Sequence, residues 1–179
     1  MWWLDRPKPC LPVRLIVAGT LAVAVAGCFQ PMYADRSLTG GPSLRDAMRD
    51  VEIAAVTGRI GQEIRNDLIF ELTGGDGNPV GAPFRLTLTV AAGTFQPTID
   101  VSAGRASAET VTLDVTYKLL DVVSDKTVLT DKALARVTID RSQQRFARVR
   151  AIRDAENRAA KVVAEQIRSR LASYLLTRT

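Results

Sequence analysis

The residue with the clearest chemistry in this sequence is Cys28, which ends the run Val25-Ala26-Gly27-Cys28. An aliphatic residue, two small residues and a cysteine form the pattern of a lipobox. The small side chains let a peptidase approach the backbone, and the cysteine sulfur then takes a diacylglycerol. The pattern predicts cleavage before Cys28 and a covalent lipid there, an S-diacylglycerol with an N-acyl chain such as palmitate.

The residues before Cys28 have the composition of an export signal. Arg6, Lys8 and Arg14 precede an uncharged apolar run over residues 15–26, and a positive stretch followed by an apolar one is typical of a secretory signal peptide. The run is too short to cross a bilayer as a helix, which needs about 20 residues. Ordinary cleavage after Ala26 is the alternative to lipidation. Phe29, in place of aspartate, favours the outer membrane by the enterobacterial sorting convention.

Several kinds of catalytic and metal site are excluded by composition. The chain has no histidine, and its two cysteines are Cys10, inside the signal, and Cys28. Serine–histidine and cysteine–histidine catalysis and the commonest zinc sites are therefore absent, as are a disulfide and a cysteine cluster in the cleaved chain. Carboxylate pairs remain possible in principle, but Asp114 and Asp121 are more simply exposed strand or turn residues. We expect no enzyme, no metal and no cofactor beyond the lipid.

The rest of the chain alternates between strand and helix patterns. Apolar residues four apart from Ile60 to Leu72 predict a helix that Gly74-Gly75 ends. Strict alternation of apolar and polar residues predicts strands. The expected elements are strands over 51–56, 84–90, 111–119 and 134–140, helices over 60–72 and 149–176, a polar loop over 93–106 and a turn at 124–126.

This order, β-α-β-β-β-α, predicts an α+β fold. Two helices pack on one face of a four-stranded sheet that is mainly antiparallel, or mixed. The other face of the sheet is exposed to solvent or contacts a partner. The predicted organisation is a removed signal over 1–27, a lipidated N-terminus and spacer over 28–50, and one domain over 51–179.

Positive charge gathers at the start of the last helix. From Arg141 onward there are ten basic and three acidic residues, a net charge of +7. A basic patch can bind nucleic acid, but an exported lipoprotein seldom meets any, so none is expected. Phosphorylated glycolipids at a membrane surface are better candidates, because arginine contacts phosphate through two hydrogen bonds. The alternative is a solvated helix face rich in good helix formers.

Four segments, in the same order, resemble the LptE family of lipopolysaccharide-assembly lipoproteins, especially its alphaproteobacterial branch. They are Cys28-Phe29-Gln30-Pro31-Met32-Tyr33 and residues 59–66, 115–121 and 154–172. The glycine that follows the cysteine in the family is replaced by Phe29, which bears on the linker and not on the fold.

The resemblance implies a partner and a location. Proteins similar to LptE sit partly inside the outer-membrane β-barrel LptD as a plug, help it assemble, and contact lipopolysaccharide. It therefore implies a lipid-anchored outer-membrane protein, facing the periplasm or inside the barrel, with an LptD-like barrel and lipopolysaccharide as partners. As an extension, we expect Arg105, Arg145 and Arg148 to contact lipid A phosphates. The alternative is an unrelated periplasm-facing lipoprotein that binds a lipid or another small ligand in a closed apolar pocket.

Overall fold

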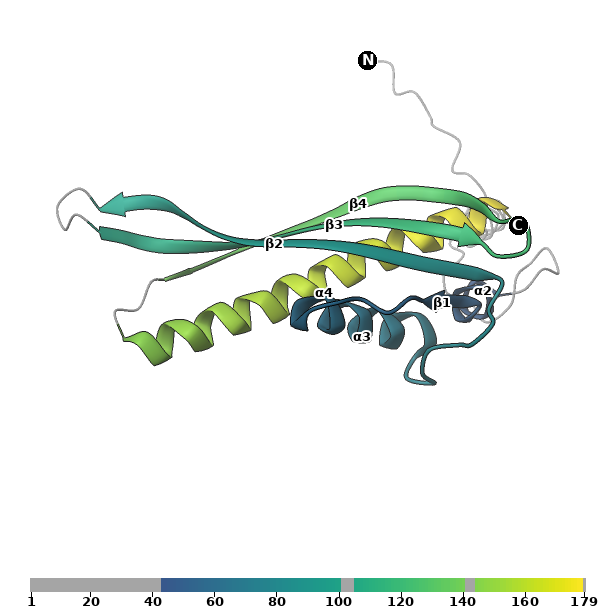
Figure 1. Ribbon diagram of the computed structural model, residues 1–179, viewed down its shortest axis with the longest axis horizontal. Helices are drawn as coiled ribbons and strands as arrows, with labels where there is room; N and C mark the ends of the chain where they lie inside the picture. The colour runs from purple at the N-terminus through teal and green to yellow at the C-terminus, as the bar shows by residue number, and fades with distance from the viewer. Residues whose placement is uncertain (1–42, 101–104, 141–143, 179) are drawn as a thin grey trace, which may run out of the picture. The chain divides into compact units, whose positions relative to one another are not determined.

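The computed structural model describes residues 43–100, 105–140 and 144–178, all within one compact unit, Asp35–Thr179. The four strands form one sheet in the order β1-β2-β3-β4, and α3 and α4 pack on the same face of it (Figure 1). The predicted α+β fold is confirmed. The elements in chain order are α2 (Leu44–Arg49), β1 (Val51–Ile53), α3 (Arg59–Thr73), β2 (Phe84–Asp100), β3 (Arg105–Asp121), β4 (Lys126–Asp140) and α4 (Arg145–Arg178).

The sheet is mixed because one of its connections is a helical crossover. Short β1 runs parallel to β2, with Val51 opposite Phe84, and parallel neighbours need a long connection, here through α3. The other two pairs, β2–β3 and β3–β4, are antiparallel. β1 reaches only as far as Ile53 opposite Leu86, so among the described strands most of β2 has a neighbour on one side only.

Helix α3 forms as its apolar spacing predicts. Ile64 and Leu68 are fully buried and Leu72 nearly so, because residues four apart lie on one helix face. The helix ends where Gly74 adopts a left-handed conformation, and its N–H donates to the Phe70 carbonyl oxygen over 2.8 Å. Glycine takes this conformation without the steric penalty of a side chain.

Helix α4 lies close to the sheet because its inward face is built from small residues. Ala155, Ala159 and Ala164 are essentially fully buried, and Ala133 and Ala135 of β4 are buried as well. Larger core side chains lie toward the C-terminal part of the helix, where burying a residue such as Leu171 contributes about 1.5–3 kcal/mol. No helix in the described ranges is long and apolar enough to span a membrane.

β4 begins at Lys126, before the expected residue 134, and β1 ends at Ile53, before the expected residue 56. The structure extends the predicted elements in three further places. Residues 43–50, assigned to the spacer, include α2, whose Leu44 and Met48 are buried, so packing begins before residue 51. Residues 93–106, expected to be a polar loop, mostly belong to β2 and β3. Thr94 and Phe95, on opposite faces of β2, are both exposed. The alternation of buried apolar and exposed polar residues that predicts a strand is therefore missing here, and the strand is maintained by its ladder with β3. Helix α4 begins at Arg145, before the expected residue 149.

Gly61 allows the start of α3 to approach the segment that follows β1. A Cβ at Gly61 would lie 2.6 Å from Val56 Cγ1 and 3.3 Å from Val56 Cβ. We therefore expect Gly61→Ala to lower the free energy of unfolding in urea by about 1 kcal/mol, since overpacking exceeds the gain in helix propensity.

In a Val56→Ala background the steric conflict is removed, and the same Gly61→Ala change should then stabilise the protein. Gln62→Ala, at the exposed next position, is the control and should change the stability little. Destabilisation of equal size in both backgrounds would contradict this explanation.

Candidate functional site

The fold has one end that α3 does not cover. We call it the hairpin end, where β2 ends, β3 begins, β4 ends and α4 begins (left in Figure 1). Arg59, the first residue of α3, donates hydrogen bonds to Glu156 and, over 3.0 Å, to Asn157 of α4. The part of α4 before Glu156 therefore extends beyond α3, as Figure 1 shows.

Two of the three predicted lipid A ligands lie on the first turn of α4. Arg145 is exposed, and Arg148 lies three residues further along the helix. Arg105 is the first residue of β3, opposite Asp100 in the ladder, at the tip of the hairpin. Its side chain lies outside the described residues, as does Cys28. The backbone thus brings all three arginines to the hairpin end.

Arg148 is already engaged within the protein. Its Nε donates to both carboxylate oxygens of Glu109, over 2.8 and 3.1 Å. The Glu109 side chain is completely buried, whereas that of Arg148 is 37% exposed. A buried carboxylate requires a charged or hydrogen-bonding partner, so this ion pair ties the start of α4 to β3 and leaves part of the guanidinium facing solvent.

Glu109 was missed in the sequence, although its position contained a signal. The inward residues of β3 alternate strictly, and Val111, Leu113 and Val115 are all buried. Glu109 lies two residues before Val111, so the period of two places a carboxylate on the apolar face. A charged residue at an inward position predicts a buried partner.

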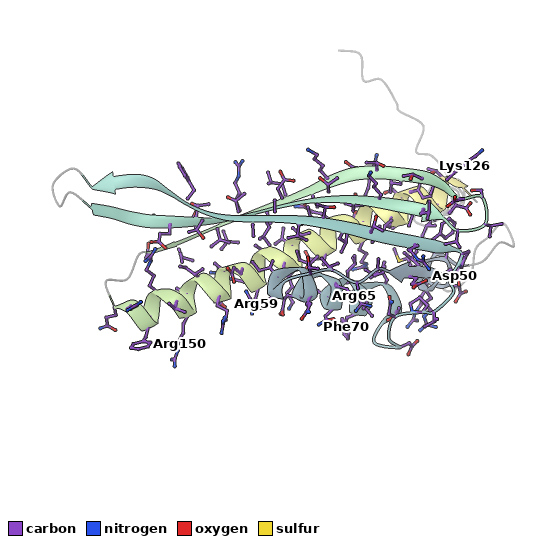
Figure 2. All side chains as sticks on the ribbon, in the orientation of Figure 1. Asp50, Arg59, Arg65, Phe70, Lys126 and Arg150 are labelled. Carbon is purple, nitrogen blue, oxygen red and sulfur yellow. The ribbon has the colours of Figure 1, made fainter. Side chains whose placement is uncertain are left out.

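Apolar side chains are exposed among the arginines of the hairpin end. Phe146 is 85% exposed, Val149 54% and, on β2, Phe95 66%. Arg150 and Arg153 are exposed on the same part of α4, and Figure 2 shows Arg150 directed away from the sheet. Cationic and apolar groups together can contact a ligand with both phosphates and acyl chains, as in a membrane glycolipid.

The face of the sheet opposite the helices is rich in hydroxyl and charged groups. Cross-strand rows run Thr87–Lys118–Thr130, Thr89–Thr116–Lys132 and Gly93–Thr112–Arg136. In a further row, the hydroxyls of Thr110 and Thr138 are 3.0 Å apart. No helix in the described part of the chain covers this face (Figure 1), so it is available to a polar environment.

Among the described residues, the pKa values of two ionisable groups depart from their ordinary range, and both groups lie in the packed part of the fold. Burial, and secondarily Asp131, raises the pKa of Tyr117 to about 12, although Arg170 acts in the opposite direction. Burial, and secondarily Glu63, raises the pKa of Asp67. The phenol of Tyr117 therefore stays neutral at physiological pH beside the ion pair that Arg170 Nε forms with Asp131 over 2.9 Å.

The described surface also has a shallow hollow on α4. It is open to solvent and includes polar side chains such as Gln166, Ser169 and Arg170. Among the described residues, no three histidine, cysteine, aspartate or glutamate side chains are grouped so as to hold a metal ion.

Several solved structures that resemble this fold are described as bacterial lipoproteins. A putative lipoprotein from Caulobacter crescentus has 27% sequence identity and a TM-score of 0.61, over 74% of this chain and 96% of the other. Rare lipoprotein B from Shewanella oneidensis has 13% identity and a TM-score of 0.53, over 71% and 95%. A minor lipoprotein from Acinetobacter baumannii has 12% identity and a TM-score of 0.55, over 69% and 89%.

These likenesses define the class as a small α+β domain with the fold of these proteins. Residues 48–171 match the LptE family, described as lipopolysaccharide-assembly, and the chain belongs to this family. The resemblance found in the sequence is thereby confirmed. No curated protein sequence matches the chain closely enough to count as a relative.

The ion pair of Glu109 and Arg148 should contribute measurably to stability. Arg148→Ala removes the guanidinium from a fully buried carboxylate, and we expect a loss of about 2 kcal/mol, within the range for hydrogen bonds to charged groups. Arg150→Ala, at an exposed position of the same helix turn, is the matched control and should change the free energy of unfolding in urea little. Equal effects of the two variants would show that the ion pair does not anchor the helix.

Proposed function

We propose that this protein is an outer-membrane lipoprotein, anchored by a lipid on Cys28, that accompanies an LptD-like β-barrel as plug and assembly partner and contacts lipopolysaccharide. The supporting observation is the extent of the family match, which covers residues 48–171 and therefore nearly all of the described fold. A match over a whole domain carries more weight than a short motif. The role is one of assembly and binding, without catalysis.

The uncovered face of the sheet suits such a position. The lumen of an outer-membrane barrel is polar, and rows of threonine, lysine and arginine across β2, β3 and β4 can hydrogen bond to it. An apolar outer face would instead need burial against another apolar surface. This chemistry supports docking in a lumen by the sheet, with α3 and α4 on the opposite side.

The hairpin end supports contact with lipopolysaccharide. Arg145 and the exposed part of Arg148 are cations suited to phosphate, and Phe146 and Val149 offer apolar surface beside them. The alternative, a ligand-binding module, requires a closed apolar pocket. In the described structure the inward residues of β3 and the buried residues of α4 belong to one core cluster, which includes Leu119 and Ile167, and this favours the assembly role.

Purification of the tagged full chain from outer membranes tests the barrel partnership. We expect a large β-barrel to accompany it in equal amount and to remain bound in mild detergent, because a plug is enclosed by its partner. A tagged outer-membrane lipoprotein of another family, prepared in parallel, controls for carry-over. Recovery of the chain alone would contradict the proposed function.

Charge reversal at the hairpin end tests the lipopolysaccharide contact. Arg105→Glu with Arg145→Glu should weaken lipopolysaccharide binding to the detergent-solubilised protein roughly tenfold or more, since charge-assisted contacts to phosphate are lost. Arg148 is left unchanged because it holds the buried Glu109.

The matched control, Lys126→Glu with Lys161→Glu, changes the net charge equally on exposed residues of β4 and α4. Figure 2 shows Lys126 at the opposite end of the fold from Arg150. An equal loss in both pairs would indicate a net-charge effect, and unchanged binding in the first pair would remove the arginines from the proposal.

A further inference from the structure

Amide side chains close the sheet at two of its edges. At β1, the Ile53 N–H donates to Asn78 Oδ1 over 2.9 Å, and Asn78 Nδ2 donates to the Ile53 carbonyl oxygen over 3.1 Å. At β4, the Leu134 N–H donates to Gln166 Oε1 over 3.2 Å, and Gln166 Nε2 donates to the Leu134 carbonyl oxygen over 3.1 Å. Each amide occupies the place that the backbone of a neighbouring strand would take.

Charged groups protect the β4 edge further. Asp131 Oδ1 accepts from the Lys132 N–H over 2.8 Å, while Arg170 of α4 binds its other oxygen over 2.9 Å. Lys132 and Arg136 are themselves exposed on this strand. Charged side chains and covered backbone groups are the ordinary means by which edge strands avoid pairing with other chains.

Within the described ranges, neither form of protection is found at the exposed edge of β2 beyond Leu86. The Ala54 N–H donates to the Leu86 carbonyl oxygen over 2.9 Å, and Arg65 Nε binds the Ala54 oxygen over 3.2 Å, which ends the pairing of β1. Because a strand has a period of two, the backbone groups of residues 88, 90, 92 and 94 point to the same side as the Leu86 oxygen. No other group in the described parts of the chain bonds these outward groups.

The composition of this edge is unusual for an exposed strand. Residues 87–95, TLTVAAGTF, contain no charge and no proline. The ladder with β3 is regular up to Phe95, where a register shift begins, so residues 88–94 form a continuous open edge of about 23 Å at 3.3 Å per residue. An edge that is long and uncharged is expected to pair with another strand.

The helix layer is also incomplete beside the open edge. Leu88 and Val90 are half-buried on the helix side, whereas Ala92 and Thr94 on the same face are exposed, and so is Phe95. On the opposite face the space beside Gly93 is open as well, because nothing lies within 4 Å of a Cβ placed there. A strand at this edge could therefore place large side chains beside the small ones of β2.

We propose that the open edge, residues 88–94 of β2, is where an extended, uncharged segment of the barrel partner adds to the sheet as a further strand. This inference rests on the barrel partnership proposed above. The wall of a closed barrel has no free edge, so the segment is a loop or terminal strand that enters the lumen. It has bulky apolar side chains on the helix side, next to Val90 and Ala92.

A second copy of this chain fits the open edge less well. Two β2 edges paired about a two-fold axis would set alanine and glycine of one copy against the same small residues of the other. Cross-strand pairs supply much of the stability of a sheet, and alanine and glycine pairs contribute least. A partner segment with large apolar residues fills the space that self-pairing would leave empty.

Proline substitutions in the full chain, expressed in cells and purified in mild detergent, test this inference. Ala92→Pro removes one outward N–H and leaves the neighbouring hydrogen bonds to β3 in place. The amount of barrel that co-purifies with the chain should therefore fall roughly tenfold. Thr138→Pro removes an outward N–H from β4 by the same alternation, counted from Leu134, and should retain the barrel. Thermal unfolding followed by circular dichroism confirms that both variants are folded. If Ala92→Pro does not fold, Ala92→Lys replaces it, with Thr138→Lys as its control.

The outcomes separate the two proposals. Loss of the barrel in the β2 variant alone supports strand addition at the open edge. Equal retention by both variants overturns strand addition and leaves the barrel partnership standing. Absence of the barrel from the unaltered chain contradicts the proposed function, and this inference with it. A doubled mass of the unaltered chain that Ala92→Pro returns to the monomer assigns the edge to a second copy and also overturns it.

Discussion

The packing of α4 on β3 and β4 is the interaction on which the rest of this structure depends. Buried alanines line the facing surfaces, among them Ala159 and Ala164 on the helix and Ala135 on β4. Small side chains allow a close approach, and close packing supplies the dispersion contacts that hold two layers together. The helix is also near enough for Gln166 and Arg170 to reach the β4 edge, so the same contact that builds the core closes one side of the sheet.

A difference in length between the two helices creates the surface to which we assign function. Helix α3 has 15 residues and α4 has 34, whereas β2 and β3 have 17 each. A helix rises about 1.5 Å per residue and a strand about 3.3 Å, so α3 covers less than half the length of these strands. The uncovered part of the sheet and the exposed start of α4 follow from this shortfall, whereas the open edge of β2 follows from the shortness of β1. Glu109 and Arg148 anchor the otherwise exposed helix start.

The sequence predicted much of the packed part of the fold. Apolar residues four apart predicted α3, and the alternation of apolar and polar residues predicted the inward faces of β2 and β3. Both predictions work because an element buried on one face must repeat its apolar residues with the period of that element. The hairpin end was less predictable. Residues 91–95 are exposed on both faces, so strand formation there rests on backbone hydrogen bonds to β3, which leave no apolar pattern. The roles of Asn78 and Gln166 depend on contacts between distant segments, and sequence spacing does not show such contacts.

We propose that the polar face of the sheet lies inside the barrel partner. Asp114, on the outer face of β3 between Ala91 and Leu134, is exposed and can be changed to cysteine in a chain whose remaining thiol, Cys28, is expected to carry lipid. Reaction of Asp114→Cys with a membrane-impermeant thiol reagent in opened outer-membrane preparations is the direct measurement. The account predicts slow labelling in the membrane and fast labelling once detergent and denaturant separate the chain from its partner. Labelling at the same fast rate in both states would contradict it.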